Sequence, residues 1–329
     1  MMLPGPGFEA GTETMAILDD WKGLVKLMSI REYPGDQKNN RDLIIMKRAC
    51  RRWFCVWHGV AVELLVAIVL CGVSNFSVQG ADCSASPSGL AGWWPAEGNV
   101  NDVVSTNHGA FQGGASGGAT GAVGSAFSFD GTNGFVQIPD ASVFHPTNLT
   151  IECWVRFSSL DSAGSGGSPA GDQYVVFKQN SRNSGFEGFD LSKTRSGNDV
   201  FRFLVSSSAG QSVEVHSTSA ITVGTWYHVA AVRGSNFISL YVNGQLQNQA
   251  TVGFAQDYGT IPLFFGTSGQ SYWDHKLKGN LDEVSLYNRA LNSAEILAIY
   301  NAGAAGKCRV GHHGATREPD GTNRLKCYF

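Results

Sequence analysis

The residues of this chain best suited to hold a ligand form a short run of aromatic and acidic side chains, Tyr272-Trp273-Asp274, between two predicted strands. Sugar rings stack on exposed aromatic rings, and sugar hydroxyls hydrogen-bond to carboxylates and amides, so such a run in a loop is typical of a glycan site. Tyr258, beside Asp257, is a second position of the same kind. We therefore predict that Tyr272, Trp273, Asp274 and Tyr258 bind the ligand. The alternative is that Trp273 folds back into the core.

The sequence lacks the residue patterns of the common catalytic sites. It holds no Ser-His-Asp ordering, no H-E-x-x-H pattern and no phosphate-binding loop. Asp282 and Glu283 are adjacent, and adjacent residues of a strand point to opposite faces, so we do not expect them to act as a pair. His228 alternates with apolar neighbours and is interpreted as a structural histidine rather than a base. We therefore predict that the protein is not an enzyme.

The composition favours a β protein that does not bind nucleic acid. The 329 residues include 24 basic and 27 acidic ones, which gives a formal net charge of −3 and no basic surface for a phosphate backbone. Charged residues make up 16% of the chain, and there are 41 glycines. Such a mixture suits many strands joined by tight turns, in one large all-β domain or two small ones.

The N-terminal region has the pattern of an export signal that begins inside the chain. Residues 1–45 show no sustained periodicity, and we interpret them as unstructured or as an artefact of start-codon choice. After Met46 a basic cluster is followed by an apolar run that ends at Val73, and by small or β-branched residues before Ala81. This pattern predicts a signal peptide over residues 46–80, and hence a secreted or cell-surface protein with no membrane span in the mature chain. A retained membrane anchor is the alternative, although a glutamate interrupts the apolar run and leaves it near the lower length limit of a span.

Four of the seven cysteines follow the predicted signal, namely Cys83, Cys153, Cys308 and Cys327. In an oxidising compartment a Cys83–Cys308 disulfide would tie together the two ends of the globular region and stabilise it by roughly 4 kcal/mol in the chain-entropy model. A Cys308–Cys327 disulfide is the local alternative. Cys153 lies in an apolar segment and is interpreted as a buried free thiol.

The region between Gly89 and Phe265 has the pattern of an antiparallel β-sandwich. Segments rich in β-branched and aromatic residues alternate with turn signals such as Asn-Gly and Asp-Gly pairs, without intervening helices. Such spacing favours two antiparallel sheets packed face to face. Residues 110–124 and 158–171 are interpreted as pliable loops. The predicted strands, with one more that follows this region, are Leu90–Trp94, Ala126–Phe129, Phe135–Ile138, Leu149–Phe157, Tyr174–Lys178, Phe201–Ser206, Ser212–Ser217, Trp226–Arg233, Phe237–Val242, Ile261–Phe265 and Leu281–Tyr287.

The segment Leu149–Phe157 alternates in the way expected of a half-buried strand. Ile151, Cys153 and Val155 fall on one face, and charged residues together with Trp154 fall on the other. We therefore expect the first face to lie in the core and the second to be at least partly exposed to water.

One helix is predicted, directly after the last strand. Asn292 is suited to cap the backbone amides of the first turn, with Glu295 as its reciprocal partner. Leu291 is placed to pack against Ile296, and Gly303 is suited to end the helix. No other segment after the predicted signal has a convincing helical pattern, so sheets must close most of the fold.

Five motifs occur in order along the chain, FDGTNGFVQIP (129–139), LTIECWV (149–155), GTWYHVA (224–230), LYVNG (240–244) and GNLDEVSLYNRAL (279–291). Together they resemble the LamG-like jellyroll family, which belongs to the concanavalin A-like lectin/glucanase superfamily. The resemblance runs from about Leu90 to Ala302. It implies two curved antiparallel sheets, a small helix after the last strands and a secreted or cell-surface binding role. We expect the jellyroll domain at residues 84–305, followed by an irregular tail at 306–329.

The resemblance also suggests a structural calcium ion, because related jellyrolls often bind one through acidic groups near the first strand and before the last. Glu97, Asp102 and Asp282 are the matching positions, and their carboxylate oxygens suit a hard cation. The alternative is that Asp282 hydrogen-bonds loop amides, and Asp130 is interpreted as a turn residue. The E-x-D-x-x-E strand motif of the superfamily's glucanases is absent, and the residues that match the pentraxin calcium cluster, 267–270, contain no carboxylate.

These observations predict an all-β protein, an antiparallel two-sheet jellyroll sandwich with one short C-terminal helix. We expect it to be secreted, to bind a glycan or an extracellular protein, and to catalyse no reaction. The alternative is an accessory domain of a larger surface adhesin or polysaccharide-active enzyme. One structural calcium ion is the cofactor that the sequence suggests.

Overall fold

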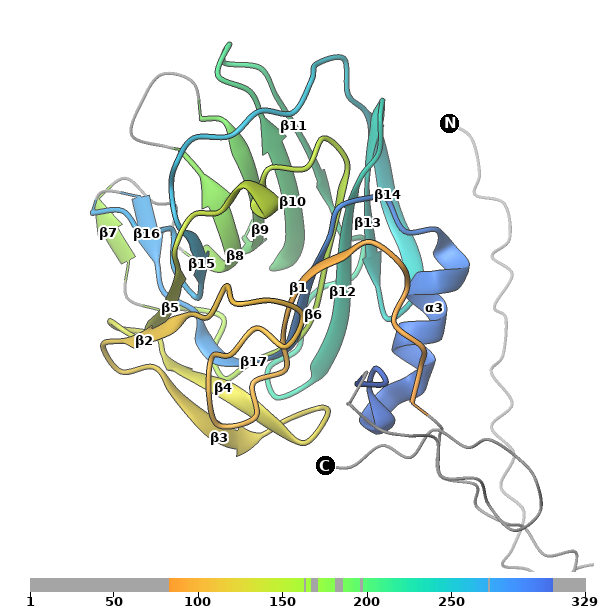
Figure 1. Ribbon diagram of the computed structural model, residues 1–329. Helices are drawn as coiled ribbons and strands as arrows, with labels where there is room; N and C mark the ends of the chain where they lie inside the picture. Colours follow the sequence, from red (N-terminus) through yellow and green to blue (C-terminus); the bar gives the residue numbers. More distant parts are fainter. Residues whose placement is uncertain are drawn as a thin grey trace, which may run out of the picture. The chain divides into compact units, whose positions relative to one another are not determined.

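The computed structural model describes residues 83–162, 164–166, 171–180, 186–195, 198–271 and 273–309, all within one compact unit. The predictions for residues 1–80, Tyr272 and Cys327 lie outside these ranges. The described part consists mainly of two antiparallel sheets stacked face to face, with one short α-helix on the outer side of one sheet (Figure 1). The predicted fold class is therefore confirmed.

The eight-stranded sheet is organised around two long strands that pair with each other, β6 and β17. In spatial order it comprises β14 (Gln245–Thr251), β13 (Phe237–Val242), β12 (Trp226–Arg233), β6 (Leu149–Phe157), β17 (Lys278–Tyr287), β4 (Ser125–Asp130) and β3 (Ser116–Thr120), with β1 (Leu90–Trp94) paired to the end of β17. Ile151, Cys153 and Val155 of β6 lie in the core, as the alternation predicts, and Cys153 is a free thiol there.

The seven-stranded sheet covers the other side of the core. In spatial order it comprises β11 (Ser212–His216), β10 (Val200–Ser206), β9 (Gly188–Thr194), β8 (Gln173–Gln179), β15 (Leu263–Phe265), β5 (Phe135–Ile138) and β2 (Ala110–Gln112). The remaining strands, β7 (Gly164–Gly166) and β16 (Trp273–His275), form a separate ribbon, and single 3-10 turns occur at η1 (Ser142–Phe144) and η2 (Gly303–Ala305).

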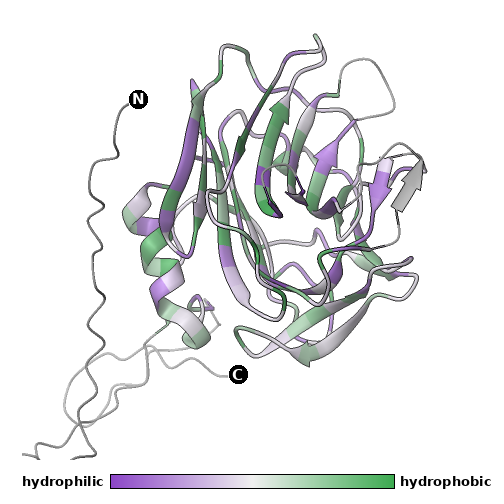
Figure 2. Ribbon diagram, turned by 180° about the vertical axis from the view of Figure 1, so that it is seen from behind, coloured by the Kyte–Doolittle hydropathy of each residue, from purple (hydrophilic) through white to green (hydrophobic). Residues whose placement is uncertain are grey.

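Aromatic rings fill much of the space between the two sheets. Trp94 is fully buried, and its ring centroid lies 5.9 Å from that of Phe144 and 5.4 Å from that of Phe265. Phe127 reaches the same Phe265 ring at 6.3 Å. Figure 2 shows hydrophobic residues on the strands that face the core, whereas the edge strand β14 is mostly hydrophilic. Burial of these rings is the main source of stability for a sandwich of this kind.

Several strands lie where the sequence predicted loops or gave no signal. Residues 110–124 contain β2 and β3, and the short strand β7 lies within the predicted loop 158–171. The pattern of β3 is weak because it consists of small residues at the edge of a sheet, where it pairs only with β4. The edge strand β14 escaped prediction because its polar side chains are largely exposed and need no apolar alternation.

The α-helix within the described residues, α3 (Ser293–Ala302), has the predicted boundaries and caps. The side chain of Asn292 accepts hydrogen bonds from the backbone amides of Ala294 and Glu295, and Oε2 of Glu295 accepts one from the amide of Asn292. Leu291 and Ile296 are buried in one cluster on the outer face of the eight-stranded sheet. In the part of the chain that the structure describes, no helix is both long and apolar enough to cross a bilayer.

The side chains on the outer face of β6 are less exposed to solvent than the sequence predicts. Thr150 and Glu152 are fully buried, and Trp154 is 9% exposed. The prediction of a partly wet face holds only for Arg156, which is half-buried. The reason is α3, which packs over this face and stacks Tyr300 on Trp154 with 5.8 Å between ring centroids.

The two ends of the described domain are joined. A disulfide links Cys83 to Cys308, which is the first of the two pairings considered from the sequence. Next to it Ser84 forms a parallel β-bridge with Lys307. Lys307 is buried and its side chain forms ion pairs with the eight-stranded sheet, so the folded domain continues past the predicted boundary at residue 305.

Candidate functional site

The outer face of the seven-stranded sheet carries a groove over β8, β9 and β10. Alternate residues of β10, such as Phe203, point into the core, whereas Arg202 and Leu204 point outward and line the groove. The groove has a volume of about 190 Å³. This is below the range of pockets that enclose a drug-sized molecule, so the groove would hold one end or one edge of a larger ligand.

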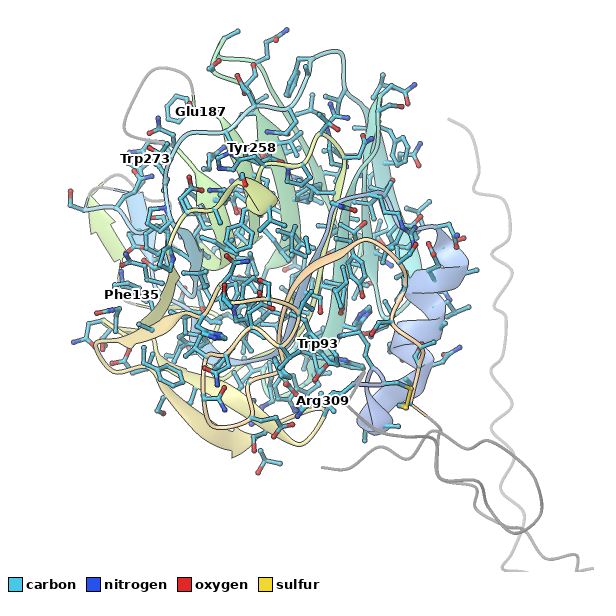
Figure 3. All side chains as sticks on the ribbon, in the orientation of Figure 1. Trp93, Phe135, Glu187, Tyr258, Trp273 and Arg309 are labelled. Atoms are coloured by element: carbon cyan, nitrogen blue, oxygen red, sulfur yellow. A yellow bond between two sulfur atoms is a disulfide. The ribbon has the colours of Figure 1, made fainter. Side chains whose placement is uncertain are left out.

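Aromatic side chains border this groove. Tyr174 and Phe177 of β8 lie in its wall, with their ring centroids 5.2 Å apart in a T-shaped arrangement. Two further rings on its lining stay accessible to solvent, because Trp273 is 47% exposed and Phe186 is 46% exposed. Figure 3 labels Trp273 and also Glu187, the neighbour of Phe186, in the same region of the molecule. Exposed rings at the rim of a groove are suited to stack on a flat apolar surface of a ligand.

The polar part of the groove is formed by two aspartates and an arginine. The side chain of Arg202 donates to Oδ2 of Asp190 at 2.6 Å and to the hydroxyl of Ser192 at 3.2 Å. Asp172 and Asp190 also line the groove, and each is only 2% exposed. Burial raises the pKa of the Asp190 carboxyl above its ordinary value, against the opposing effect of the Arg202 charge. These three side chains give the groove a polar centre between its aromatic walls.

Three of the four ligand residues predicted from the sequence are described, namely Trp273, Asp274 and Tyr258, and they do not come together in the groove. Trp273 lines the groove and does not fill the core. Asp274 is 5% exposed and is held in its own loop, where it accepts hydrogen bonds from the hydroxyl of Thr267 and the amide of Ser268, both at 2.9 Å, and pairs with Lys276. Asp274 is therefore placed to brace the short strand β16, which carries Trp273, against residues 267 and 268.

Tyr258 also lies away from the groove. Its hydroxyl donates to the carbonyl of Pro146 at 2.9 Å, and its ring stacks on His145 with 5.2 Å between centroids. Burial raises the pKa of this phenol well above its ordinary value. Its neighbour Asp257 accepts hydrogen bonds from the amide of Ser208. The ring packs against the core and does not line the groove.

Sequence reasoning missed Asp172, Asp190 and Arg202. The strand β9 was not predicted, although Phe189 and Leu191 alternate with polar residues along it. That alternation was the available signal, since it places Asp190 on the face opposite the core. Binding residues are more often sought in loops than on strands. The groove was missed because Asp190 and Arg202 lie on strands.

Glu97, Asp102 and Asp282, the predicted calcium ligands, do not form one cluster. The carboxylate of Asp102 is already hydrogen-bonded to nearby backbone. Its Oδ1 accepts from the amides of Trp93 at 3.0 Å and Val104 at 2.9 Å. Glu97 accepts from the amide of Ser125 at 3.2 Å. In the described segments, no group of three His, Cys, Asp or Glu side chains is placed to hold a metal. The three predicted residues therefore do not act as a set of side-chain ligands.

Asp282 alone has surroundings that suit a cation. Its Oδ2 accepts a hydrogen bond from the amide of Val123 at 2.9 Å, whereas Oδ1 is buried and has no donor among the described residues. The space beside the backbone of Gly121 is surrounded by oxygens. A β-carbon added at Gly121 would lie 2.5 Å from Oδ2 of Asp282 and 2.7 and 2.8 Å from the carbonyl oxygens of Val123 and Ser125. Burial, with the charge of Glu283 as a smaller cause, raises the pKa of Asp282 to about 8. An anionic carboxylate here needs a positive partner, and the oxygen donors match a hard cation.

Asp282 and Glu283 lie on the same side of the sheet, contrary to the prediction from strand alternation. The pairing of β17 with β6 contains a bulge between Asp282 and Ser285, and Glu283 has a positive φ of 57°. Asp282 is opposite Trp154, which lies on the outer face, and Glu283 reaches Lys307 on that face too. Asp130, in contrast, accepts hydrogen bonds from the amides that follow it, as predicted for a turn residue.

A buried ion cluster closes the outer face of the eight-stranded sheet. The Nζ of Lys307 lies 2.9 Å from Glu152 and 2.9 Å from Glu283, and 5.0 Å from the ring centroid of Trp93. Burial disfavours the charged form of Glu152, yet the Lys307 charge and the His228 hydrogen bond lower its pKa to about 2. His228 is fully buried with its Nε2 3.2 Å from Glu152, in agreement with its interpretation as a structural residue. Figure 3 shows Trp93 and Arg309 at this end of the domain, near the disulfide.

Comparison with known proteins finds one matching family model and several similar solved structures. The family model described as the concanavalin A-like lectin/glucanases superfamily matches residues 130–297. No curated protein matches the sequence. Among solved structures, domain 4 of the extracellular arabinanase AbnA from Geobacillus stearothermophilus, in complex with arabinotriose, has a TM-score of 0.50 and 18% identity, covering 65% of this chain and 98% of that one. The binding domain of Paraclostridial Mosquitocidal Protein 1 has a TM-score of 0.51 and 16% identity, covering 65% of this chain and 52% of that one.

Proposed function

Since the chain belongs to the concanavalin A-like lectin/glucanase superfamily, we propose that it is a non-catalytic carbohydrate-binding module whose ligand occupies the groove over β8, β9 and β10. The observation that carries this proposal is the combination of solvent-exposed rings, Trp273 and Phe186, with buried polar groups at the centre of one groove. Such a combination suits sugars, which present an apolar ring face and polar hydroxyls together. The arabinotriose complex of the AbnA domain supports the choice of a glycan.

The non-catalytic part of the proposal has its own test. Glycoside hydrolysis uses two carboxyl groups on either side of the scissile bond, and Asp172 and Asp190 are two carboxyl groups in one groove. Oδ2 of Asp190 is paired with Arg202, and this positive charge opposes a role for Asp190 as the proton-donating acid. We expect no reducing ends to be released when the full-length protein is incubated with each polysaccharide that it binds. Release that is lost in Asp172→Asn would contradict this part of the proposal.

Replacing Trp273 with alanine is expected to weaken glycan binding about tenfold, because a stacking ring contributes on the order of 1.4 kcal/mol. The glycans are those bound by the full-length protein on a printed array, and affinities are measured by isothermal titration calorimetry. Leu246→Ala is the matched control, since Leu246 is 51% exposed but lies on β14 of the other sheet. Equal affinities for the Trp273 variant and the unchanged protein would exclude this side of the groove from binding.

We also propose one structural calcium ion at Asp282, held with the backbone carbonyls of Val123 and Ser125 and with Glu97 nearby. When bound, such an ion supplies the positive charge that the buried Asp282 carboxylate lacks. Calcium at 100 times its Kd is expected to stabilise the fold by about 2.7 kcal/mol, which raises the Tm by roughly 5 to 10 °C. Calorimetry with calcium and then with chelator measures this shift.

Two variants test whether Asp282 is the carboxylate that binds the calcium ion. Asp282→Asn is expected to abolish the calcium-dependent rise in Tm, whereas Asp102→Asn should retain it, because the carboxylate of Asp102 is committed to its own loop. A calcium response that survives in Asp282→Asn, or no response in the unchanged protein, would exclude this site.

Export is part of the same proposal. The Cys83–Cys308 disulfide supports it, since such bonds persist mainly in oxidising compartments. Amino-terminal sequencing of protein recovered from the culture medium tests it, and a chain that keeps residues 46–80 would contradict cleavage of the predicted signal.

A further inference from the structure

Two carboxylate oxygens in the groove lack a hydrogen-bond donor. Oδ1 of Asp172 and Oδ1 of Asp190 are buried, and no described residue donates to either. Both residues line the groove. A buried acceptor without a donor costs free energy, and an ionised carboxylate can only accept. A group that forms a hydrogen bond with either Oδ1 atom must therefore be the donor, and the hydroxyl of a ligand can donate such a bond.

The positive charge in the groove is already balanced. The Nη2 of Arg202 pairs with Asp190 at 2.6 Å, and its Nη1 lies 4.0 Å from Glu214, a neighbour on β11. The Nε of Arg202 donates to Ser192 at 3.2 Å. Among the residues that the structure describes, two carboxyl groups and one guanidinium are the charged groups on the lining of the groove. An anionic ligand would therefore meet carboxylates in a partly desolvated site, with the arginine engaged elsewhere.

We propose that the groove selects neutral, hydroxyl-rich sugars and rejects acidic ones, with Asp172 and Asp190 accepting hydrogen bonds from sugar hydroxyls and Asp190 keeping Arg202 from binding anions. This inference rests on the proposed function, and it adds the chemical class of the ligand. Asp190 has two roles in it, as a hydroxyl acceptor through Oδ1 and as the partner of Arg202 through Oδ2.

The test compares sugars that differ in charge but share a backbone. The full-length protein is applied to an array that carries N-acetyllactosamine with and without a terminal sialic acid, and oligogalacturonides with and without methyl esters. It also carries neutral arabino-, xylo-, gluco- and manno-oligosaccharides. Calorimetric titration then measures affinities for each bound glycan and its charged counterpart. We expect the neutral member to bind at least tenfold more tightly than the acidic one.

Asp190→Asn is the informative variant. It removes the closest ion-pair partner of Arg202 and leaves the more distant carboxylates of Asp172 and Glu214, so the preference for neutral over acidic members should shrink at least fivefold. Asp172→Asn is expected to weaken binding of the neutral member about fivefold without increasing binding of the acidic one. Asp161→Asn is the charge-matched control, since the side chain of Asp161 is 69% exposed and pairs with Arg195 outside the groove. Circular dichroism melts establish that each variant is folded.

Each outcome decides a different point. Equal or tighter binding of the acidic members, or an unchanged preference in folded Asp190→Asn, overturns the assignment of ligand class while carbohydrate binding itself stands. No binding to any glycan on the array overturns the proposed function, and this inference with it.

Discussion

Lys307→Met is expected to lower the free energy of unfolding by about 3 to 5 kcal/mol, because it leaves two buried carboxylates without their cation. Lys307 forms ion pairs of 2.9 Å with both Glu152 and Glu283, and all three side chains are at most 2% exposed. Methionine keeps most of the volume of the lysine chain, so the loss measures charge rather than packing. Urea denaturation followed by circular dichroism gives the free energy.

Two further variants show whether the effect belongs to the charge cluster. Lys278→Met removes a lysine that is exposed on β17 and is expected to change the free energy of unfolding by less than about 0.5 kcal/mol. Glu152→Gln and Glu283→Gln, added to Lys307→Met, are expected to restore much of the lost stability, because the triple variant buries no unpaired charge. If Lys307→Met and Lys278→Met change the free energy of unfolding by the same small amount, the ion cluster does not stabilise the domain.

Replacing both Cys83 and Cys308 with serine is expected to cost roughly 5 kcal/mol in the chain-entropy model, since the disulfide closes a loop over a sequence separation of 225 residues. The bridge also holds the segment that carries Lys307, which is adjacent to Cys308 and pairs with Ser84. Without the bridge this segment should fray, and Lys307 should leave its carboxylate partners more often. The loss is measured by urea denaturation of the double variant.

The two effects are expected to overlap. Combining the serine pair with Lys307→Met should cost less than the sum of the separate losses, because both act through the same chain segment. Strict additivity would show that the disulfide and the ion cluster stabilise the domain independently. Unchanged stability in the serine pair would exclude the disulfide as a stabilising element.

The strongest local patterns in the sequence were sufficient for much of the fold. The alternation in β6 and the capping residues Asn292 and Glu295 depend on neighbours in sequence, and both were predicted correctly. The polar edge strand β14 and the small-residue strand β3 were not, since their stability comes from pairing with distant strands. The same limit applies to the outer face of β6, which is buried because α3 and the segment that carries Lys307 return to cover it.

The candidate site was less accessible to sequence reasoning than the fold. Trp273 was identified because an aromatic residue beside polar ones stands out in the sequence, although it lies on the short strand β16, and Asp274 beside it braces that strand through Ser268. Asp190 and Arg202 meet only through the pairing of β9 with β10, which sequence alone did not provide. The bulge that brings Asp282 and Glu283 to one face is a local departure from alternation, and alternation was the only rule available.

The covalent link between the ends of the domain has a mechanical consequence. The Cα atoms of Cys83 and Cys308 are 5.0 Å apart, so chain entering before one and leaving after the other is attached at a single point. Tension applied along such a chain passes through the sulfur atoms and bypasses the strands between them. A domain tethered in this way would keep its groove intact under pulling forces, such as those of flow or of a moving cell, until the disulfide itself is reduced.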